Sequence, residues 1–384
     1  MKNKKKILII FPYWDATYRN KNIGKFLSLL DRDQIDLYIY CSKSSSDKDI
    51  GEFLPHANLL NFRPEVKRGF WNRFISLLFF MTVLVRLRNF YVFWTYAGYI
   101  ENFLLAILNI PFVLKSDSTL EIANSNDTFF KKFRSWMFFT YIGKKAKLIL
   151  VETRKLQKKS EEIYDQDKVL FFPNGVNINA YNKFIDNKKN YISPKKNGIF
   201  LCTGRMLPSK GIDLAIKSFS SISEESSWEL HFVGTQEDKT YLDQCKKLVK
   251  ENQLEARVFF HGPCFGNDLF KWYQEADVFI MPSRNEGLAN RLPEAMIFGN
   301  PIVAYDVGYT SALVSNASGA LIKKNDFKSF AKEMLRFEKN TELRNKTSLH
   351  NINYVKKNLN DDLIFDSLFN KSNKVGVEIK ASPK

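Results

Sequence analysis

The sequence predicts an α/β fold with two doubly wound parallel sheets, one after the other along the chain. Short apolar runs of strand length alternate with helical stretches in both halves. A polar stretch at residues 185–197, with Pro194 and pairs of lysines, separates the two alternations and has the composition of a linker. The length of 384 residues fits two to three domains of roughly 150 residues each.

The first half opens on the run Ile7–Phe11, which is short and wholly apolar and is therefore typical of a buried strand. Further strands are expected at Ile35–Cys41, Tyr91–Tyr96, Pro111–Lys115, Lys147–Val151 and Val169–Phe172. Helices are expected at Asn22–Leu30, 69–90, Tyr99–Leu108, Phe129–Tyr141 and Leu156–Tyr164.

The second half repeats the alternation. Strands are expected at Ile199–Thr203, Glu229–Val233, Arg257–Phe260, Val278–Met281, Ile302–Tyr305 and Ala320–Ile322. Helices between them include Thr240–Glu251, Asp268–Ala276, Pro293–Phe298 and Phe327–Phe337.

These elements divide the chain into three parts. We expect an N-terminal Rossmann-like domain over 1–185, a second over 186–360, and a helix and tail over 361–384. The last helix, near Asp361–Phe369, is expected to return to the first domain, and the polar tail after it to be disordered. Parallel sheets bind ligands at the carboxyl ends of their strands, so the two domains are expected to face each other across a cleft.

Composition excludes several classes of protein. Apolar residues make up 45% and charged residues 26%, so the chain is neither wholly disordered nor collagen-like. The four cysteines form no C-x-x-C pair or Cys/His cluster, which predicts free thiols in a reducing compartment and no metal site. The net charge is +17, and residues 1–185 hold 29 basic against 17 acidic residues. A basic surface on the first half predicts an anionic partner: nucleic acid, anionic lipid or a phosphorylated substrate.

No stretch of the sequence predicts a membrane span or a signal peptide. The longest apolar run, near Phe74–Val85, has about 12 residues, short of the ~20 that a transmembrane helix needs. The basic start is followed by Ile7–Phe11, but this run breaks at Pro12 and no small-residue cleavage site follows. We therefore expect a cytoplasmic protein.

The segment Asn285–Ala304 carries the strongest chemical signal. Glu286 and Glu294 are separated by seven residues, and Pro293 suits the first turn of a helix that Glu294 enters. The loop before this helix is expected to present backbone N–H groups to an anion. Two carboxylates beside such a site suit hydroxyl-rich groups, one of a sugar and one of a ribose. The alternative is that Glu294 only complements the helix dipole and Glu286 is a solvated loop charge.

The wider pattern resembles retaining glycosyltransferases of family four, which have the GT-B fold. It is most similar to their subgroup with the motif E-G-L-P-N-x-x-x-E-A-M, and the resemblance covers residues 172–306. The segments that carry it are Phe172–Asn177, Gly204-Arg205 with Lys210-Gly211, Phe232–Gly234, Phe260–Gly262, Glu275–Ser283, Glu286–Leu288, Glu294–Met296 and Gly299–Ala304.

The resemblance implies transfer of a sugar from a UDP- or GDP-sugar to a glycan or polyprenyl-linked acceptor, in the biosynthesis of a surface polysaccharide such as a capsule. Glu286 is then expected to contact hydroxyls of the donor sugar, and Glu294 the ribose. Arg205 and Lys210 neutralise the diphosphate, so that no metal is needed. The resemblance further implies that the sugar and the diphosphate bind backbone groups of Gly287, Leu288, Ala289 and Asn290. Gly204, Gly234 and His261 complete the predicted substrate site, with the nucleobase near His261.

The first half departs from the family in two places. The Gly-Gly turn that many members have after the first strand is missing, since only Gly24 follows the loop Phe11–Ile23. A family histidine after the strand Pro111–Lys115 is replaced by Ser116-Asp117-Ser118-Thr119. Asp117 either takes the role of this histidine toward the donor sugar or acceptor, or is an N-cap or turn residue. His261 is either part of the base site or simply a strand-end residue. For the mechanism, the resemblance implies a front-face reaction in which the leaving phosphate oxygen takes the proton of the acceptor.

Two stretches, Phe70–Phe90 and Phe129–Lys145, combine aromatic with basic residues. They are either core helices with solvated cations at their ends, or an interfacial surface on anionic lipid at the inner face of the cell membrane. Three rival functions stay open: a GT-B-like enzyme of another chemistry, such as an inverting transferase, a catalytically silent glycan- or nucleotide-binding subunit of a transferase complex, and a basic nucleic-acid binder. No recognised nucleic-acid module appears in the sequence, which disfavours the third rival.

Overall fold

The computed structural model describes residues 4–10, 22–31, 33–42, 51–63, 78, 80–85, 90–95, 99–116, 128–185, 198–286, 289–377 and 379. The chain forms two compact units, Met1–Asn174 with Ile364–Lys384, and Gly175–Leu363. The expected domain boundary, at 185–186, lies later in the chain than this one. The difference arises because helix α8 (Ile178–Ile185) precedes the polar linker but packs on the second unit, where Tyr181 stacks 4.4 Å from Phe270.

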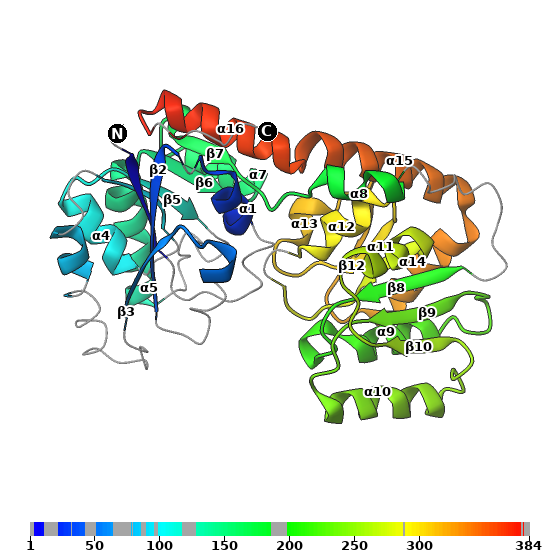
Figure 1. Cartoon of the computed structure of the whole chain (residues 1–384). Coiled ribbons are helices and arrows are strands. Elements are labelled where there is room, and N and C mark those ends of the chain that lie inside the picture. The colour runs from blue at the N-terminus through cyan, green and yellow to red at the C-terminus, as the bar shows by residue number, and fades with distance from the viewer. Residues whose placement is uncertain are drawn as a thin grey trace. The chain divides into compact units, whose positions relative to one another are not determined.

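The first unit contains a seven-stranded parallel sheet in the order β3-β2-β1-β4-β5-β6-β7 (Figure 1). Its strands are β1 Lys5–Ile10, β2 Ile35–Ser42, β3 Asn58–Arg63, β4 Phe90–Thr95, β5 Phe112–Ser116, β6 Leu148–Val151 and β7 Val169–Phe171. Its helices are α1 Asn22–Leu29, α4 Tyr99–Ile107, α5 Phe129–Met137, α6 Gly143–Lys145, α7 Arg154–Glu161 and, from Ile364 onward, α16 Asp361–Lys374. A π-helical turn, Phe138–Ile142, joins α5 to α6.

The second unit contains a six-stranded parallel sheet in the order β10-β9-β8-β11-β12-β13. Its strands are β8 Ile199–Thr203, β9 Glu229–Val233, β10 Val258–His261, β11 Val278–Met281, β12 Ile302–Tyr305 and β13 Gly319–Ile322. Besides α8, its helices are α9 Ile212–Ser220, α10 Lys239–Glu251, α11 Gly266–Glu275, α12 Arg291–Ile297, α13 Thr310–Leu313, α14 Phe327–Lys339 and α15 Thr341–Asn358. The strand order reverses between β8 and β11, as it does between β1 and β4 in the first unit.

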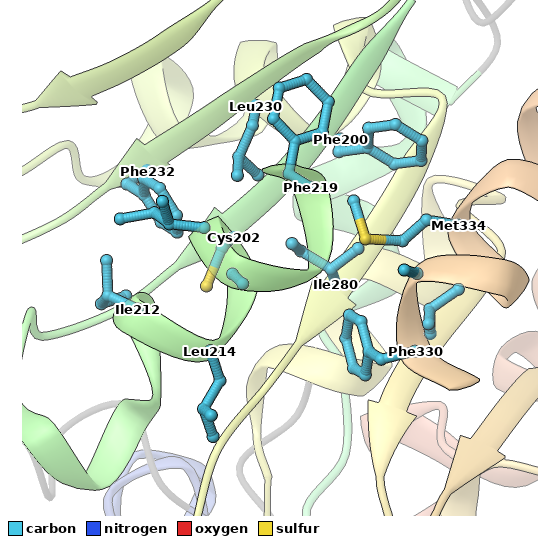
Figure 2. Close-up of a cluster of buried hydrophobic side chains, with 14 of the residues drawn as sticks. Phe200, Cys202, Ile212, Leu214, Phe219, Leu230, Phe232, Ile280, Phe330 and Met334 are labelled. Carbon is cyan, nitrogen blue, oxygen red and sulfur yellow. The ribbon is translucent and has the colours of Figure 1, made fainter. Parts of the chain in front are cut away.

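Both faces of the second sheet are buried, because successive side chains of each strand point to opposite sides. Phe200 and Cys202 of β8 pack on one side with α9 and α14, and Leu201 packs on the other with α12. Figure 2 shows the first of these clusters, in which Phe232 lies beside the sheet near Cys202. Strands covered on both faces read as continuous apolar runs, which explains why the sequence located them well.

Several elements differ from the expectation. Strand β3 was not predicted, because Asn58 and Asn61 interrupt its apolar pattern. The expected helix over 69–90 gives way at Phe90 to β4, and of its residues the structure describes only 78, 80–85 and 90. The predicted disorder of the tail was wrong in its first part. Helix α16 continues to Lys374, and Val377 and Ile379 are buried in the core of the first unit.

Among the residues that the structure describes, no helix is both long and apolar enough to cross a lipid bilayer.

The core of the second unit allows a direct test. Phe200 is fully buried between Phe219, with ring centroids 6.2 Å apart, and Trp228, at 4.9 Å. Phe200→Ala is therefore expected to lower the free energy of unfolding by about 3–5 kcal/mol, measured by urea denaturation. Phe265→Ala, at a side chain that is 72% exposed, is the control and is expected to change it by about 0.5 kcal/mol or less. Equal effects of the two substitutions would contradict the described core.

Candidate functional site

A pocket lies at the carboxyl ends of β8 and β11, where the strand order of the second sheet reverses. Open α/β sheets bind ligands at this kind of position. The lining residues are Cys202, Thr203, Gly204, Arg205, Met206, Lys210, Ile212, Phe232, Val233, Met281, Ser283, Glu286, Ala289, Asn290 and Arg291. The pocket thus brings together six of the residues predicted from sequence: Gly204, Arg205, Lys210, Glu286, Ala289 and Asn290.

Two glycines let the loops after β8 and β9 approach each other beside this pocket. Gly234 has a φ of 157°, and a Cβ added there would lie 1.7 Å from the carbonyl oxygen of Gly204. The Gly204 N–H in turn donates to the Val233 carbonyl at 2.9 Å. Gly234 therefore permits the close approach of the two backbones, and its predicted contact with the substrate stays a prediction.

Lys210 and Glu286 form an ion pair on the pocket wall. The Lys210 Nζ lies 2.6 Å from the Glu286 Oε1, and the side chains are 26% and 12% exposed. The Ser283 hydroxyl also donates to the same Glu286 oxygen, at 2.7 Å. Two donors from different loops therefore fix the orientation of the Glu286 carboxylate. Ser283 was not predicted as a site residue, although a polar residue just beyond the carboxyl end of a buried strand is the signal that could have found it.

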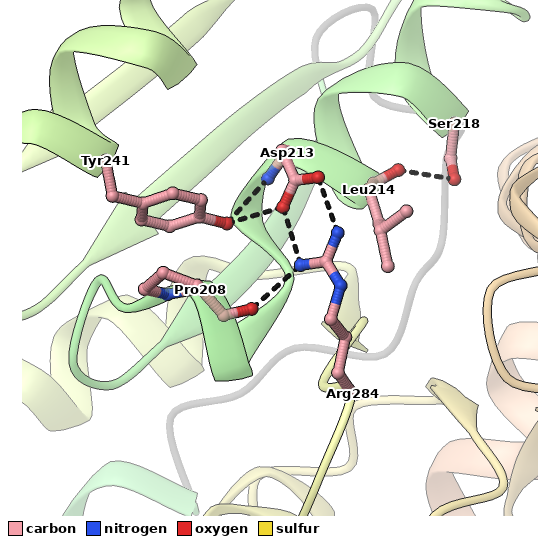
Figure 3. Close-up of polar contacts among 6 residues, drawn as sticks. All are labelled: Pro208, Asp213, Leu214, Ser218, Tyr241 and Arg284. Carbon is pink, nitrogen blue, oxygen red and sulfur yellow. Dashed lines mark hydrogen bonds and ion pairs between the residues drawn. The ribbon is translucent and has the colours of Figure 1, made fainter.

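Arg284 ties together the two loops that carry this ion pair (Figure 3). Its guanidinium makes two hydrogen bonds to the Asp213 carboxylate, at 2.8 and 2.6 Å, and donates to the Pro208 carbonyl at 2.8 Å. Its backbone N–H donates to the Ser209 carbonyl at 2.8 Å. We call Arg284, Asp213 and Tyr241 the brace. Tyr241 completes it because its hydroxyl donates to Asp213 at 2.6 Å.

The brace sets the protonation of its carboxylate. Burial acts to raise the pKa of Asp213, but the hydrogen bonds from Arg284 and Tyr241 outweigh burial, and the pKa lies below its usual value. Asp213 is therefore charged in the folded state at neutral pH. Neither Arg284 nor Asp213 was predicted as a site residue, because one follows a strand and the other enters a helix far away in the sequence.

Glu294 has partners of its own behind the pocket wall. Its Oε2 accepts from the Tyr273 hydroxyl and from Arg291 NH1, each at 2.9 Å. The Tyr273 hydroxyl also lies 2.9 Å from the Thr203 Oγ1. The Glu294 side chain is 25% exposed, and its partner Arg291 lines the pocket directly, as does Thr203, which Tyr273 connects to Glu294. Neither Arg291 nor Tyr273 was predicted as a partner, because these contacts form only when the elements of the unit pack together.

The remaining residues of the motif differ in placement. Arg205 is 62% exposed, and its guanidinium stands 4.0 Å from the Glu237 carboxylate, a weak contact. Helix α12 begins at Arg291, two residues before the expected Pro293. The side chain of Asn290, at the N-cap position, makes no capping hydrogen bond to the first turn of the helix. Gly287 and Leu288 lie outside the described residues. Their predicted contacts stay predictions.

His261 lies at the end of β10 in a row of polar side chains rather than in the pocket lining. Its Nε2 is 3.1 Å from His231 Nδ1, and His231 Nε2 is 3.0 Å from Glu229 Oε2. The His261 ring also packs on Trp272, with centroids 4.4 Å apart. Burial, and secondly the charge of His231, hold the pKa of His261 below its ordinary value. His261 is thus the last residue of its strand, and its predicted place near the nucleobase stays a prediction.

Asp117 lies outside the described residues, so its role stays a prediction. Two residues earlier in the sequence, Lys115 of β5 forms a buried ion pair with Glu152, the residue after β6, with 2.7 Å between the charged atoms. This ion pair could not be predicted from the sequence, because a single lysine at the end of an expected strand does not indicate which carboxylate it contacts.

Within the described ranges, no three His, Cys, Asp or Glu side chains are grouped so that they could hold a metal ion.

With this geometry in hand, the chain can be compared with known proteins. Residues 183–352 match the model of the family Glycosyl transferases group 1. An uncharacterized glycosyltransferase of Haemophilus influenzae is 29% identical over 158 residues, which are 40% of this chain and 43% of that protein. The lipopolysaccharide core biosynthesis mannosyltransferase LpcC of Rhizobium leguminosarum is 30% identical over 129 residues, 33% of this chain and 36% of that protein. The chain therefore matches less than half the length of these curated relatives.

The solved structures show the fold. The crystal structure of Anabaena HepE in complex with UDP is similar over 96% of this chain and all of that chain, with a TM-score of 0.72 and 16% sequence identity. The chain has the GT-B fold, with parallel sheets in two Rossmann-like domains.

The brace generates a prediction with a defined pH dependence. Asp213→Asn is expected to lower the free energy of unfolding by about 1.5–3 kcal/mol at pH 7, because a charged partner of Arg284 is lost. The folded-state pKa of Asp213 is depressed, so its contribution is complete above the unfolded pKa, near pH 4, and is lost as the pH falls through the folded pKa. Urea denaturation from pH 7 to pH 2.5 measures this.

In that series, the difference between the wild type and Asp213→Asn is expected to be constant above about pH 5 and to shrink below about pH 4. Glu225→Gln, at an exposed pair with Lys339, is the matched control and should show a small difference throughout. A difference that grows as the pH falls would contradict the brace.

Proposed function

We propose that this protein is a retaining glycosyltransferase of family four, which moves a sugar from a nucleotide-sugar donor to a glycan or polyprenyl-linked acceptor in surface polysaccharide biosynthesis. The observation that carries the proposal is the pocket at the strand reversal of the second sheet, where Arg205, Lys210 and Glu286 stand together. The family match over residues 183–352 covers this pocket and supports a glycosyl-transferring activity.

The charges of the pocket suit a nucleotide sugar. Arg205 is exposed, and among the described residues its guanidinium makes one long ion contact, with Glu237, so it is available to a diphosphate. Lys210 supplies a second cation on the same wall. A leaving diphosphate gains charge as the glycosidic bond breaks, and fixed cations stabilise that charge. The reaction is therefore proposed to need no metal, and excess EDTA should leave the rate unchanged.

The carboxylates are proposed to select the hydroxyl-bearing parts of the donor. Glu286 is oriented by Lys210 and Ser283 and would accept hydrogen bonds from the donor sugar. Glu294 is proposed for the ribose, with Arg291 and Tyr273 as its fixed partners. Polar groups set in advance by two or more partners lose little freedom when a ligand binds. The acceptor proton is proposed to go to the leaving phosphate oxygen on the front face of the sugar.

The donor is proposed to be a UDP- or GDP-sugar. HepE was crystallised with UDP, and LpcC is a mannosyltransferase of the lipopolysaccharide core, which supports a nucleotide sugar and a cell-surface glycan respectively. We further propose that the protein works in the cytoplasm, at the inner face of the cell membrane, where a polyprenyl-linked acceptor would be presented.

The donor assignment is tested by thermal unfolding with a panel of sugar nucleotides, in buffer containing EDTA. A ligand at 100 times its dissociation constant should stabilise the protein by about 2.7 kcal/mol.

Glu294→Ala is expected to raise the dissociation constant of the stabilising donor roughly tenfold or more, because a charged hydrogen-bond acceptor is lost.

Glu333→Ala is the matched control, because Glu333 forms a similar pair with Arg336, three residues later in helix α14. If Glu294→Ala binds the donor as the wild type does, the ribose assignment is wrong. If no nucleotide sugar stabilises the wild type, a catalytically silent subunit becomes the better proposal.

Arg205 is tested by turnover. Arg205→Ala is expected to lower kcat by a factor of roughly 10²–10³, because a cation opposite the leaving diphosphate is lost. Arg336→Ala, which removes an exposed arginine elsewhere in the same unit, should keep the wild-type rate. Steady-state kinetics with the identified donor measures both. A wild-type kcat in Arg205→Ala would remove this residue from the diphosphate site.

A further inference from the structure

Helix α5 of the first unit carries three large aromatic side chains that face solvent. Phe129, Phe133 and Trp136 are 82%, 48% and 60% exposed. Their spacing of four and three residues places them on one face of the helix. Their rings stack on one another, with centroids 6.4 Å apart for the first two and 5.9 Å apart for Phe133 and Trp136. A continuous exposed apolar stripe of this size marks an interaction surface.

The core of the unit does not need these three rings. The same helical run is anchored from its inner side, where Ile142 and Ala146 are buried and Met137 and Tyr141 pack against them. Tyr141 also packs on Phe103 of α4, with ring centroids 5.6 Å apart. The run therefore has a buried side that holds it in place and an exposed side that remains open to a partner.

The charge of this segment points to an anionic partner. Between Phe129 and Lys147 the sequence has no Asp or Glu, and its basic residues are Lys131, Lys132, Arg134, Lys144, Lys145 and Lys147. At the end of the run, Lys144, Lys145, Lys147 and Lys168 line a pocket with Asn109, and none of the described lining residues is acidic. Lys145 Nζ donates to the Asn109 side chain at 2.8 Å, and Lys168 Nζ to the Lys144 carbonyl at 3.1 Å.

The chain order gives this surface a direction. The run α5 to α6 follows β5 and precedes β6, so it begins at the carboxyl edge of the first sheet and ends at the amino edge. At 1.5 Å per residue, the run from Phe129 to Lys145 is about 24 Å long. The aromatic stripe therefore lies toward the edge at which an α/β domain binds its ligand, and the lysine pocket lies at the opposite edge.

We propose that the helical run from α5 to α6 forms a docking face that lies along an anionic lipid bilayer, with Phe129, Lys132, Phe133 and Trp136 at its α5 end and Lys144 and Lys145 at its α6 end. The aromatic rings enter the boundary between headgroups and acyl chains, where amphipathic helices with large apolar side chains bind. The ammonium groups contact lipid phosphates. A bilayer fits better than nucleic acid, because the rings are stacked on each other rather than set apart to receive bases. The inference rests on the part of the proposed function that gives the protein a lipid-borne acceptor.

The docking face is tested by sedimentation of the full chain with vesicles. Binding is expected to vesicles containing about one-third phosphatidylglycerol, and to be roughly tenfold or more weaker with pure phosphatidylcholine. Replacing Phe129, Phe133 and Trp136 together by Ser is expected to lower the partition coefficient on anionic vesicles roughly tenfold or more. Lys144→Glu with Lys145→Glu should lower it as well.

The matched control replaces Phe265 and Leu349, which are 72% and 64% exposed in the second unit, by Ser. It should bind vesicles as the wild type does. Because the three replaced aromatic residues are exposed, the triple variant should keep the wild-type unfolding temperature, which confirms that it folds. With brominated lipids, fluorescence quenching should be larger for the wild type than for Trp136→Phe.

Three results would overturn the docking face: an unchanged partition coefficient in the triple variant, equal loss in the control, or equal quenching of the wild type and Trp136→Phe. Conversion of a dimer to a monomer by the triple variant, with vesicle binding unchanged, would assign the face to a second copy of the chain instead. Stabilisation of the triple variant by the nucleotide sugar is measured in parallel. If the nucleotide sugar still stabilises the triple variant but the partition coefficient on anionic vesicles is unchanged from the wild type, the docking face is wrong and the proposed donor binding stands.

Discussion

A single arginine holds the two loops of the candidate site in register. Arg284 binds Asp213 at the start of α9 and the backbone of Pro208 and Ser209, while the residues beside it in the chain lead to Glu286. Lys210 follows Ser209 directly, so the ion pair between Lys210 and Glu286 is made by the same two segments. Gly211 permits this approach, since a Cβ there would lie 2.0 Å from the Pro282 carbonyl oxygen. The charged wall of the pocket depends on this one connection.

The sequence predicted the second domain better than the first, for a physical reason. The bounds of β8, β9, β11 and β12 agree with the predicted strands, because strands buried on both faces are short apolar runs with clear ends. Helix α15 was missed. Its buried face consists of Arg344, Thr347, Asn351 and Val355, so three of its four inward residues are polar. Asn351 donates to the backbone of Asn300 and Ser318, an interaction that no hydrophobic pattern reveals.

The site was predictable as a set of residues but not as a set of contacts. The spacing of Glu286 and Glu294 placed both at one sheet edge, yet each has different partners: Lys210 and Ser283 for the first, Tyr273 and Arg291 for the second. These partners come from other strands and helices, and their pairing is created only when the sheet assembles. The same limit explains why the brace was not foreseen, since its arginine and aspartate are ordinary surface residue types.

The first domain is not continuous in the sequence. Phe365 and Phe369 of α16 pack in its core, with Phe369 stacked on Phe26 and Phe365 at an edge of Phe172. During synthesis, these side chains leave the ribosome only after the whole second domain has been made, so the second domain can complete its core first. A fragment that stops at Asn174 would leave apolar surface of the first domain uncovered. Independent expression of this domain therefore calls for joining its last helix to the fragment, rather than for a simple truncation.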